Sequence, residues 1–425
     1  MKFIQRLRNA TLLKQLGPGL ITGAADDDPS GIATYSQAGA RFGFALGWTL
    51  LLTYPLMCAV QLVSAHVGRV TGKGLAANMA EMLPRPVVLL LVVLLFAANT
   101  INIGADLAMM GDAAQLVTHL PGHWMTVAFA IFSLTLQLFV SYPRYAHFLK
   151  WLTLSLFAYV AVVLMVDMDW GAALKGLFVP SVPGLGALTM IVAIFGTTIS
   201  PYLFFWQSAQ EVEEMGRRDE APLRDDARPA RAEYRRIGFD TLAGMAMSNI
   251  VALAIIWATA ATIHQHGSGD IQTAADAANA LRPVAGEYAF ALFSLGIVGT
   301  GLLAVPVLAG SAAYAIGESQ GWKAGLDHKP WEAIGFYGVI VVATLVGVLI
   351  QWSPVDPIQA LFWSAVLNGI VAVPIMAAMM YVAGKRQIMG RLPIPRRMAI
   401  WGWIATAVMA VAVVAMFVSF ALGVS

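Results

Sequence analysis

Three consecutive carboxylates, Asp26, Asp27 and Asp28, stand inside an apolar stretch that runs from about residue 16 to residue 40. Pro29 follows them directly, and glycines lie on both sides, so a continuous helix is interrupted here. Carboxylate oxygens are ligands for cations, and charges inside a membrane segment usually mark an ion or substrate pathway. If the chain lies in a membrane, these residues predict a site for a cation or a cationic substrate.

The composition is that of an integral membrane protein. Of the 425 residues, 59% are hydrophobic and only 12% are charged, whereas a soluble domain has about 25% charged residues. Eleven apolar segments each approach the roughly 20 residues that cross the hydrocarbon core, and we expect all of them to be helices. They cover residues 17–41, 44–67, 86–113, 123–141, 148–167, 185–210, 237–263, 286–315, 333–351, 356–383 and 398–421.

The basic residues predict the orientation of these helices. If the amino terminus is cytoplasmic, all of the 26 Lys and Arg residues except Arg41, Lys175 and Arg282 fall on the cytoplasmic side. A missed helix would scramble this alternation, so the distribution supports the number of helices as well as the orientation. We expect a multi-pass protein of the cell inner (plasma) membrane, with its carboxyl terminus outside and the lipid bilayer as its surroundings.

The remaining charges and motifs exclude several functions. The net charge of +2 reflects sidedness, so we expect no nucleic-acid partner. The Arg-rich run 217–236 could form a nucleic-acid or lipid patch, but its interspersed Asp and Glu residues favour a solvated cytoplasmic loop. The single cysteine, Cys58, has no partner for an intramolecular disulfide. No phosphate-binding, serine-hydrolase or zinc-protease motif is present, so we expect neither an enzyme nor a resident cofactor.

A second interruption lies in the middle of the apolar segment 185–210. Gly196, Thr197, Ser200 and Pro201 occur together where Leu and Val would be expected. A proline inside a helix removes a hydrogen bond, and a single such site would indicate only a kink. A pair of interruptions in the first and sixth segments is typical of inverted-repeat transporters, whose broken helices meet at the bilayer midplane.

We therefore predict an all-α membrane protein with one transmembrane domain, residues 1–425. It consists of two inverted five-helix repeats and an eleventh helix, which cover residues 17–167, 185–383 and 398–421. Where a helix unwinds, carbonyls at the carboxyl end of the first half carry partial negative charge. Carbonyls near Ala25 and Gly196 are the candidates, and acidic residues beside them favour a bound cation.

Several short motifs can also be compared with known families. They are Gly17-Pro18-Gly19 followed by Asp28-Pro29, then Gln61, Ser64-Ala65 and Gly68-Arg69-Val70-Thr71-Gly72-Lys73, then Asp106-Leu107-Ala108, and finally Pro201 with Ser208-Ala209. Together they resemble the Nramp (natural resistance-associated macrophage protein) family of divalent-metal transporters. The resemblance spans the first six helices and weakens after about residue 240. It implies a LeuT-type fold and a divalent metal cation as transported substrate, and we expect a monomer to suffice for transport.

The resemblance implies that Asp28 is a metal ligand, although a protonated carboxyl that only caps the break is the alternative. The family signature Asp-Pro-Gly-Asn is replaced by Asp28-Pro29-Ser30-Gly31, so the asparagine ligand becomes Gly31. Asp26 and Asp27 can face the same cation only if the backbone has unwound, because successive helical residues point about 100° apart. Otherwise they lie around the site or in a vestibule.

The sixth segment departs further from the family. Thr197 stands at the position of an alanine, Ser200 at that of a methionine and Tyr202 at that of a histidine. Thr197 and Ser200 could bind metal, or their hydroxyls could bond to carbonyls one turn back. Without the methionine sulfur, the candidate metal site is built from oxygens and small residues: Asp28, Asp27, Asp26, Ser30, Gly31, Thr197, Ser200, Gly196 and Ala25. We expect a hard, partly hydrated ion, Mg²⁺ or Mn²⁺, in preference to Fe²⁺ or Cd²⁺.

Proton coupling is expected to be weak or absent. The resemblance implies a proton route through the histidine position, now Tyr202, and through Asp106, but Met109 stands where the family has a glutamate. Residues 333–351 lack the family's arginines. Asp106, Tyr202 and Asn368, which falls near a family glutamine, are expected beside the site or on the remaining proton path. The membrane potential then supplies the drive, about 4.6 kcal/mol for a divalent ion at 100 mV.

A different substrate class remains an alternative. The same scaffold hosts carriers of amines and amino-acid-like solutes, and a fold does not determine function. Asp28 could pair with a substrate ammonium, with Ser30, Thr197 and Ser200 binding polar groups. A receptor without transport would leave the paired helix breaks unexplained.

Overall fold

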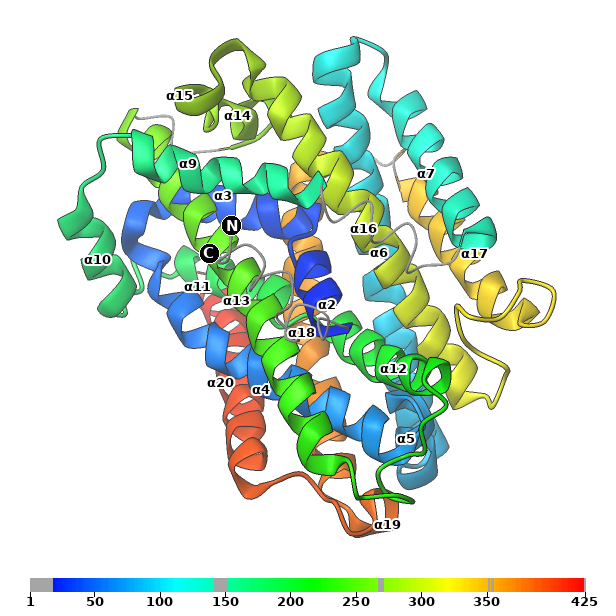
Figure 1. Ribbon diagram of the computed structural model, residues 1–425. Coiled ribbons are helices and arrows are strands. Elements are labelled where there is room, and N and C mark those ends of the chain that lie inside the picture. The colour runs from blue at the N-terminus through cyan, green and yellow to red at the C-terminus, as the bar shows by residue number, and fades with distance from the viewer. Residues whose placement is uncertain (1–17, 141–151, 267–270, 351, 353–354, 424–425) are drawn as a thin grey trace, which may run out of the picture.

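The computed structural model describes residues 18–140, 152–266, 271–350, 352 and 355–423, and every regular element in these ranges is a helix. Within them, eight helices are long and apolar enough to cross a membrane, and two shorter apolar helices cover Leu154–Met165 and Ile334–Leu349. The helices pack into one bundle, with α2 and α18 in its interior (Figure 1). The chain is an all-helical, multi-pass membrane protein.

The helices that overlap the predicted apolar segments are α2 (Pro18–Asp26), α3 (Pro29–Phe42), α4 (Trp48–Thr71), α6 (Arg85–Thr118), α7 (Gly122–Phe139), α9 (Phe157–Met165), α11 (Gly186–Thr198), α12 (Pro201–Arg217), α13 (Ala230–Thr262), α16 (Ala289–Ser319), α17 (Ile334–Ile350), α18 (Pro357–Ala383) and α20 (Arg396–Ala421). Shorter helices are α5 (Leu75–Met82), α10 (Trp170–Phe178), α14 (Ala274–Asn279), α15 (Arg282–Ala285) and α19 (Arg386–Met389).

Eight of the predicted apolar segments coincide with the eight long spans. The other three correspond to short or broken helices: 17–41 to α2 and α3, 148–167 to a short 3-10 turn and α9, and 333–351 to α17. Residues 17, 148–151 and 351 lie outside the described ranges. The count of eleven crossings therefore stays a prediction, as does the division into inverted repeats.

The first predicted helix break is confirmed. Helix α2 ends at Asp26 and α3 begins at Pro29, with Asp28 as the N-cap of α3. Pro29 has no N–H, so it cannot donate to the carbonyl of Ala25 as a helix would require. The Asp28 side chain accepts instead from the N–H of Gly31 at 2.7 Å, which starts the second half-helix.

The second predicted break is confirmed as well. Helix α11 ends at Thr198 and α12 begins at Pro201, and Ile199 and Ser200 lie between the two halves. The cause is the same, because Pro201 cannot donate to the carbonyl of Thr197. Both breaks are therefore caused by a proline in the local sequence.

Glycines allow both broken helices to pack closely against continuous helices. A Cβ atom added at Gly23 of α2 would lie 2.4 Å from the carbonyl of Gly244 in α13. One added at Gly196 of α11 would lie 2.0 Å from the carbonyl oxygen of Ala365 in α18. Small residues at such contacts let the backbones of membrane helices approach closely. Continuous helices thus hold the half-helices in place.

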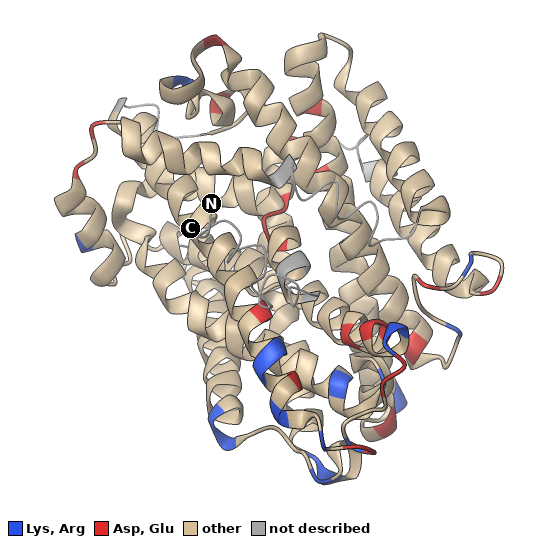
Figure 2. Cartoon of the chain, in the orientation of Figure 1, with Lys and Arg blue, Asp and Glu red and all other residues tan. Residues whose placement is uncertain are grey.

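Charged residues gather at one end of the bundle. Figure 2 shows most Lys and Arg ribbons around the α12–α13 connection, α5 and α19, which lie low in the view. The opposite end, near α14 and α15, carries few basic residues (Figure 2). This is the sidedness expected of a protein whose basic loops stay on one face of the bilayer.

Candidate cation site

Asp28 lies where the first break meets helices α6 and α12. Its Oδ1 atom accepts from the N–H of Gly31 and from the Ser30 hydroxyl, both at 2.7 Å. Its Oδ2 atom accepts from Asn102 Nδ2 at 3.1 Å and from the Tyr202 hydroxyl at 3.3 Å. Only 1% of Asp28 is exposed. The carboxylate is buried, and four donors converge on it.

Asn102 of α6 joins Asp28 to the other predicted residues. Its Nδ2 also donates to Asp106 Oδ2 at 3.0 Å, and its Oδ1 accepts from Ser364 Oγ at 3.0 Å and from Asn368 Nδ2 at 3.2 Å. Asp106 and Asn368, which the sequence placed beside the site, are therefore one side chain away from Asp28. Sequence reasoning missed Asn102, although an amide one turn before Asp106 in an apolar helix was the available signal.

Asp26 and Asp27 have a different partner. Ser248 Oγ of α13 lies 2.7 Å from Asp26 Oδ2 and 2.9 Å from Asp27 Oδ1. Both carboxylates are buried, and Asp26 Oδ1 has no hydrogen-bond partner in the described part of the chain. The three consecutive aspartates thus have different neighbours. Asp28 bonds to side chains of α6 and α12, whereas Asp26 and Asp27 bond to α13.

The Thr197 hydroxyl lies beside the Asp28 carboxylate. It is buried and has no hydrogen-bond partner among the described residues. A Cβ atom added at Gly31 would lie 3.1 Å from Thr197 Oγ1 and 3.5 Å from Asp28 Oδ1. Gly31 is therefore closely surrounded, and its lack of a side chain lets the Thr197 hydroxyl and the Asp28 carboxylate approach the same point of the break.

Ser200 and Gly196 bond to each other. The Ser200 hydroxyl donates to the carbonyls of Gly196 at 2.9 Å and Thr197 at 2.8 Å. It therefore bonds to carbonyls one turn back, which is the alternative to metal binding that the sequence left open. Its oxygen lone pairs are still able to accept or coordinate. The Ala25 carbonyl lies at the end of α2. It receives no helical hydrogen bond from the residue four positions later, because that residue is Pro29, which has no N–H.

The hydrogen-bond partners of the Asp28 carboxylate are a backbone N–H, two hydroxyls and an amide. Among the residues that the structure describes, no group of three or more His, Cys, Asp or Glu side chains could hold a metal ion. A cation at Asp28 would therefore also need other groups, and the hydroxyl oxygens of Ser30, Thr197 and Tyr202 lie nearby. Such oxygens are the donors that Mg²⁺, Ca²⁺ and Mn²⁺ prefer.

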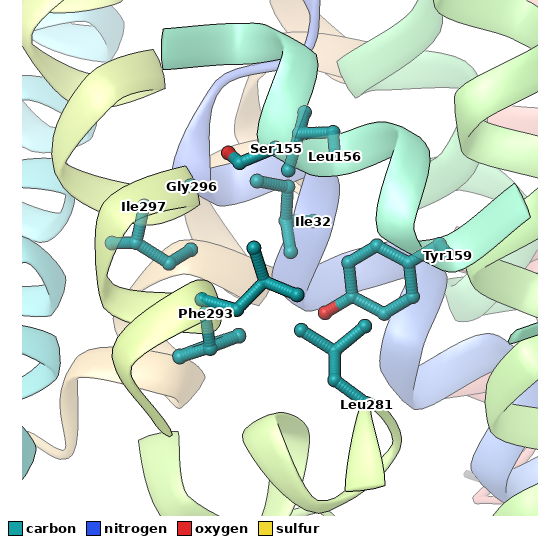
Figure 3. Close-up of a pocket in the computed structure, with 9 residues that line it drawn as sticks. Ile32, Ser155, Leu156, Tyr159, Leu281, Phe293, Gly296 and Ile297 are labelled. Carbon is teal, nitrogen blue, oxygen red and sulfur yellow. The ribbon is translucent and has the colours of Figure 1, made fainter. Parts of the chain in front are cut away.

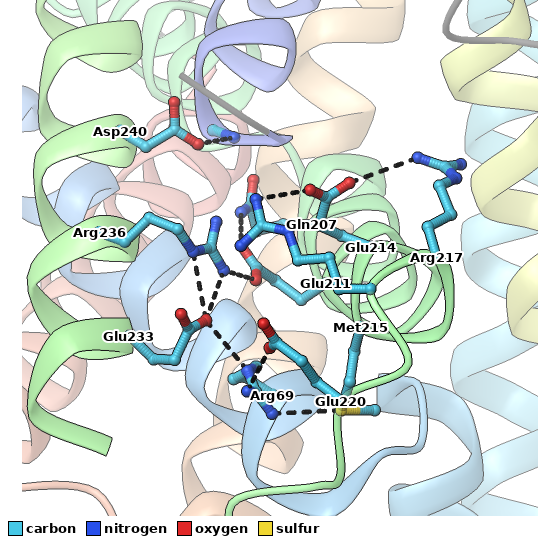
Figure 4. Close-up of polar contacts among 12 residues, drawn as sticks. Arg69, Gln207, Glu211, Glu214, Met215, Arg217, Glu220, Glu233, Arg236 and Asp240 are labelled. Atoms are coloured by element: carbon cyan, nitrogen blue, oxygen red, sulfur yellow. Dashed lines mark hydrogen bonds and ion pairs between the residues drawn. The ribbon is translucent and has the colours of Figure 1, made fainter. Parts of the chain in front are cut away.

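A second polar network ties α2 to the helices around it (Figure 4). The backbone N–H of Gly19 donates to Asp240 Oδ2 of α13 at 2.7 Å, and the Thr22 hydroxyl donates to Gln207 Oε1 of α12 at 2.7 Å. Gln207 Nε2 in turn donates to Glu211 Oε1 at 3.3 Å. The first half-helix is thus bonded to both α12 and α13.

The network continues through buried ion pairs. Arg236 lies 2.6 Å from Glu211 and 3.1 Å from Glu233, and Arg69 of α4 lies 3.1 Å from Glu233 and 2.7 Å from Glu220 (Figure 4). The expectation of a solvated loop over residues 217–236 is wrong for its last part. Helix α13 begins at Ala230, and Arg236 is buried because it neutralises two carboxylates.

A small cavity lies beside the second half of the broken helix. It lies between α3, α9 and α16 and is too narrow to hold a water molecule, and Ile32, Leu156, Phe293 and Tyr159 are among its lining residues (Figure 3). The Tyr159 hydroxyl points among apolar side chains (Figure 3). No carboxylate lines this cavity, so it lacks the ligands of a cation site.

Known proteins resemble this chain over nearly its whole length. The chain is 27% identical over 407 residues to a Deinococcus radiodurans protein named divalent metal cation transporter MntH, covering 92% of this chain and 87% of the relative. The structure of a manganese transporter from Eremococcus coleocola, with an aromatic bis-isothiourea compound, superposes with a TM-score of 0.73 at 17% identity and covers 96% of this chain and 86% of the other.

A more distant structure shares the fold. Mhp1, a nucleobase-cation-symport-1 family transporter in a closed conformation with bromovinylhydantoin bound, gives a TM-score of 0.51 at 16% identity, covering 96% of this chain and 93% of the other. The fold is that of Nramp and LeuT-type transporters. These relatives are transporters, which confirms the prediction that the chain is not an enzyme.

A family model matches almost the whole chain. Residues 19–419 match the family described as natural resistance-associated macrophage protein-like, abbreviated Nramp. This range includes both helix breaks, Asp28 and the amide cluster around Asn102. The resemblance first found in the short motifs is thereby extended beyond residue 240. The chain belongs to the Nramp family.

Proposed function

We propose that this protein is a divalent metal cation transporter that holds its ion at Asp28, between the two broken helices, and moves it by alternating access. The observation that carries the proposal is the buried Asp28 carboxylate at the α2–α3 break, facing the second break at α11–α12. The name of the Deinococcus relative, a divalent metal cation transporter, supports the substrate class.

The transported ion is a hard divalent cation, Mg²⁺ or Mn²⁺ in preference to Fe²⁺ or Cd²⁺. Support comes from the candidate ligand groups around Asp28, which are the hydroxyls of Ser30, Thr197 and Tyr202 and the side-chain amide of Asn102. Carboxylate, hydroxyl and carbonyl oxygens suit hard ions, whereas sulfur would favour softer ones.

The membrane potential drives this transport with weak or absent proton coupling. Tyr202 donates to Asp28 where the family has a histidine, and α17 contains no arginine. The amino terminus is cytoplasmic and the carboxyl terminus outside, as the basic end of the bundle suggests (Figure 2). Residues 17–167 and 185–383 form the inverted repeats, since each begins with a broken helix.

Calorimetry of the purified protein tests the site. We expect heat from Mg²⁺ or Mn²⁺ in the wild type and its loss in Asp28→Ala. Asp169→Ala is the matched control, because Asp169 is also a helix N-cap whose carboxylate accepts a backbone N–H, at 2.9 Å, but it is exposed and lies at α10. Binding of a small amine or amino acid, with no metal binding, would favour the organic-solute carrier instead.

Proteoliposomes test the ion preference and the coupling. An inside-negative potassium diffusion potential should drive uptake of Mg²⁺ or Mn²⁺ with no accompanying acidification of the lumen. Iron or cadmium that outcompetes magnesium at equal concentration would contradict the preference for hard ions. Strong metal-driven acidification would contradict the uncoupled mechanism.

A further inference from the structure

The buried side chain of Asn102 has all of its hydrogen-bonding positions occupied. Its two N–H groups are shared between Asp28 Oδ2 and Asp106 Oδ2, and its carbonyl oxygen accepts from Ser364 Oγ and Asn368 Nδ2. An amide has two such donors and two such lone pairs, so no capacity is left over. Asn102 is fully buried.

The Nδ2 group stands where a cation would stand. It lies 3.1 Å from one carboxylate oxygen and 3.0 Å from the other, and it joins α3 to α6. Its partly positive N–H groups satisfy both acceptors when no metal is bound. A metal ion that binds to Asp28 Oδ2 needs an oxygen from its neighbours and is repelled by an N–H group.

A rotation of the amide would supply that oxygen. The two ends of an asparagine side chain are nearly isosteric, so a half-turn about the terminal torsion exchanges Oδ1 and Nδ2. The turned Oδ1 would face Asp28 and Asp106, and the turned Nδ2 would face α18 and need acceptors there.

Helix α18 has both acceptors. Asn368 Oδ1 is buried without a hydrogen-bond partner in the described ranges, and Asn368 can turn in the same way to present it. The Ser364 hydroxyl also lies 2.8 Å from the carbonyl of Leu361, so its proton can stay on that carbonyl while its oxygen accepts from Asn102. In the turned state, the Oδ1 atom of Asn368 would thus accept a hydrogen bond from Asn102.

We propose that Asn102 is a reversible metal ligand: its amide donates to Asp28 and Asp106 in the metal-free site, and turns, together with Asn368, to coordinate the ion through Oδ1. Asp106 thereby becomes a carboxylate ligand of the same ion or of its retained water. The inference rests on the proposed function, because it names further ligands of the proposed cation site.

Mn²⁺ binding to three folded variants tests this assignment. Asn102→Leu removes the ligand oxygen and should lower the Mn²⁺ affinity by about tenfold or more. Asn102→Asp keeps an oxygen but removes the N–H donors, so it should bind Mn²⁺ at least as tightly as the wild type and melt at a lower temperature without metal. Asn99→Leu is the matched control, since Asn99 is a buried amide of the same helix that bonds to Leu308 and Ser311.

The outcomes separate the two proposals. If the wild type binds no divalent metal, the proposed function fails. If it binds metal through Asp28 but Asn102→Leu keeps the wild-type affinity, or Asn102→Asp loses it, only the role of Asn102 is overturned.

A measurement on the wild type covers the case in which the variants do not fold. Infrared difference spectra with ¹³C-labelled asparagine should show a side-chain carbonyl band that shifts when Mn²⁺ is added. The absence of any asparagine band in a protein that binds Mn²⁺ would overturn the inference.

Discussion

At the scale of single residues, Gly31 and Thr197 act as a pair. The Thr197 hydroxyl lies only 3.1 Å from the position that a Cβ atom on Gly31 would take. A side chain at Gly31 would be crowded, because its Cβ would lie 3.1 Å from Thr197 Oγ1 and 3.3 Å from Tyr35. The sizes of the side chains at these two positions are therefore coupled.

This pairing makes a prediction about double variants. Gly31→Asn should weaken Mn²⁺ binding by about tenfold, since overpacking typically costs about 1–3 kcal/mol and would displace Asp28 or Thr197. Adding Thr197→Ala should restore part of the loss, as measured by calorimetry. Gly216→Asn, at an exposed glycine with no atom within 4 Å of its added Cβ, is the control. A double variant no better than Gly31→Asn alone would show that the positions act independently.

At the scale of elements, α2 is the half-helix with bonds on two sides. It contacts α13 through Gly19, Gly23 and Asp240, and α12 through Thr22 and Gln207. Gln207 is bonded to Glu211, whose other oxygen pairs with Arg236. The position of the first half-helix therefore depends on charges that lie outside the cation site.

Arg236→Ala should be strongly destabilising. It would leave Glu211 buried without its ionic partner, whereas Glu233 would keep Arg69, and breaking a buried pair costs about 3–5 kcal/mol. Arg218→Ala, which breaks the Arg218–Glu214 pair with 35% and 23% of the side chains exposed, should cost about 0–1 kcal/mol. Unfolding of both variants in detergent measures the difference. Equal losses would mean that the network around Arg236 is not a buried unit.

At the scale of the whole molecule, orientation is the property that remains to be measured. Cys58 is buried and is the single cysteine, so a Cys58→Ala background has no competing thiol. In intact cells, a membrane-impermeant maleimide should label Glu287→Cys, which is exposed beside α15, and should leave Asp225→Cys, which is exposed between α12 and α13, unlabelled. In lysed cells it should label both. The reverse pattern in intact cells would mean that the basic end of the bundle faces outward.

The sequence was most informative where the cause of a structure is local. Pro29 and Pro201 break their helices because a proline lacks an N–H wherever it stands, and both breaks are found at the predicted residues. Apolar length likewise located the long helices to within a few residues at most ends. The Arg-rich segment was the exception, since Arg236 is buried against Glu211 of another helix as well as against Glu233 of its own.

The sequence by itself determined the membrane class, the two breaks and the family, and it predicts Asp28 as the ligand, because composition, proline chemistry and short motifs are properties of neighbouring residues. Only the tertiary structure decided what surrounds that carboxylate. Asn102 is 74 residues from Asp28 and 262 from Ser364, and Ser248 is 222 from Asp26. Such contacts depend on how helices pack, and helix packing is set by the whole bundle rather than by any one segment.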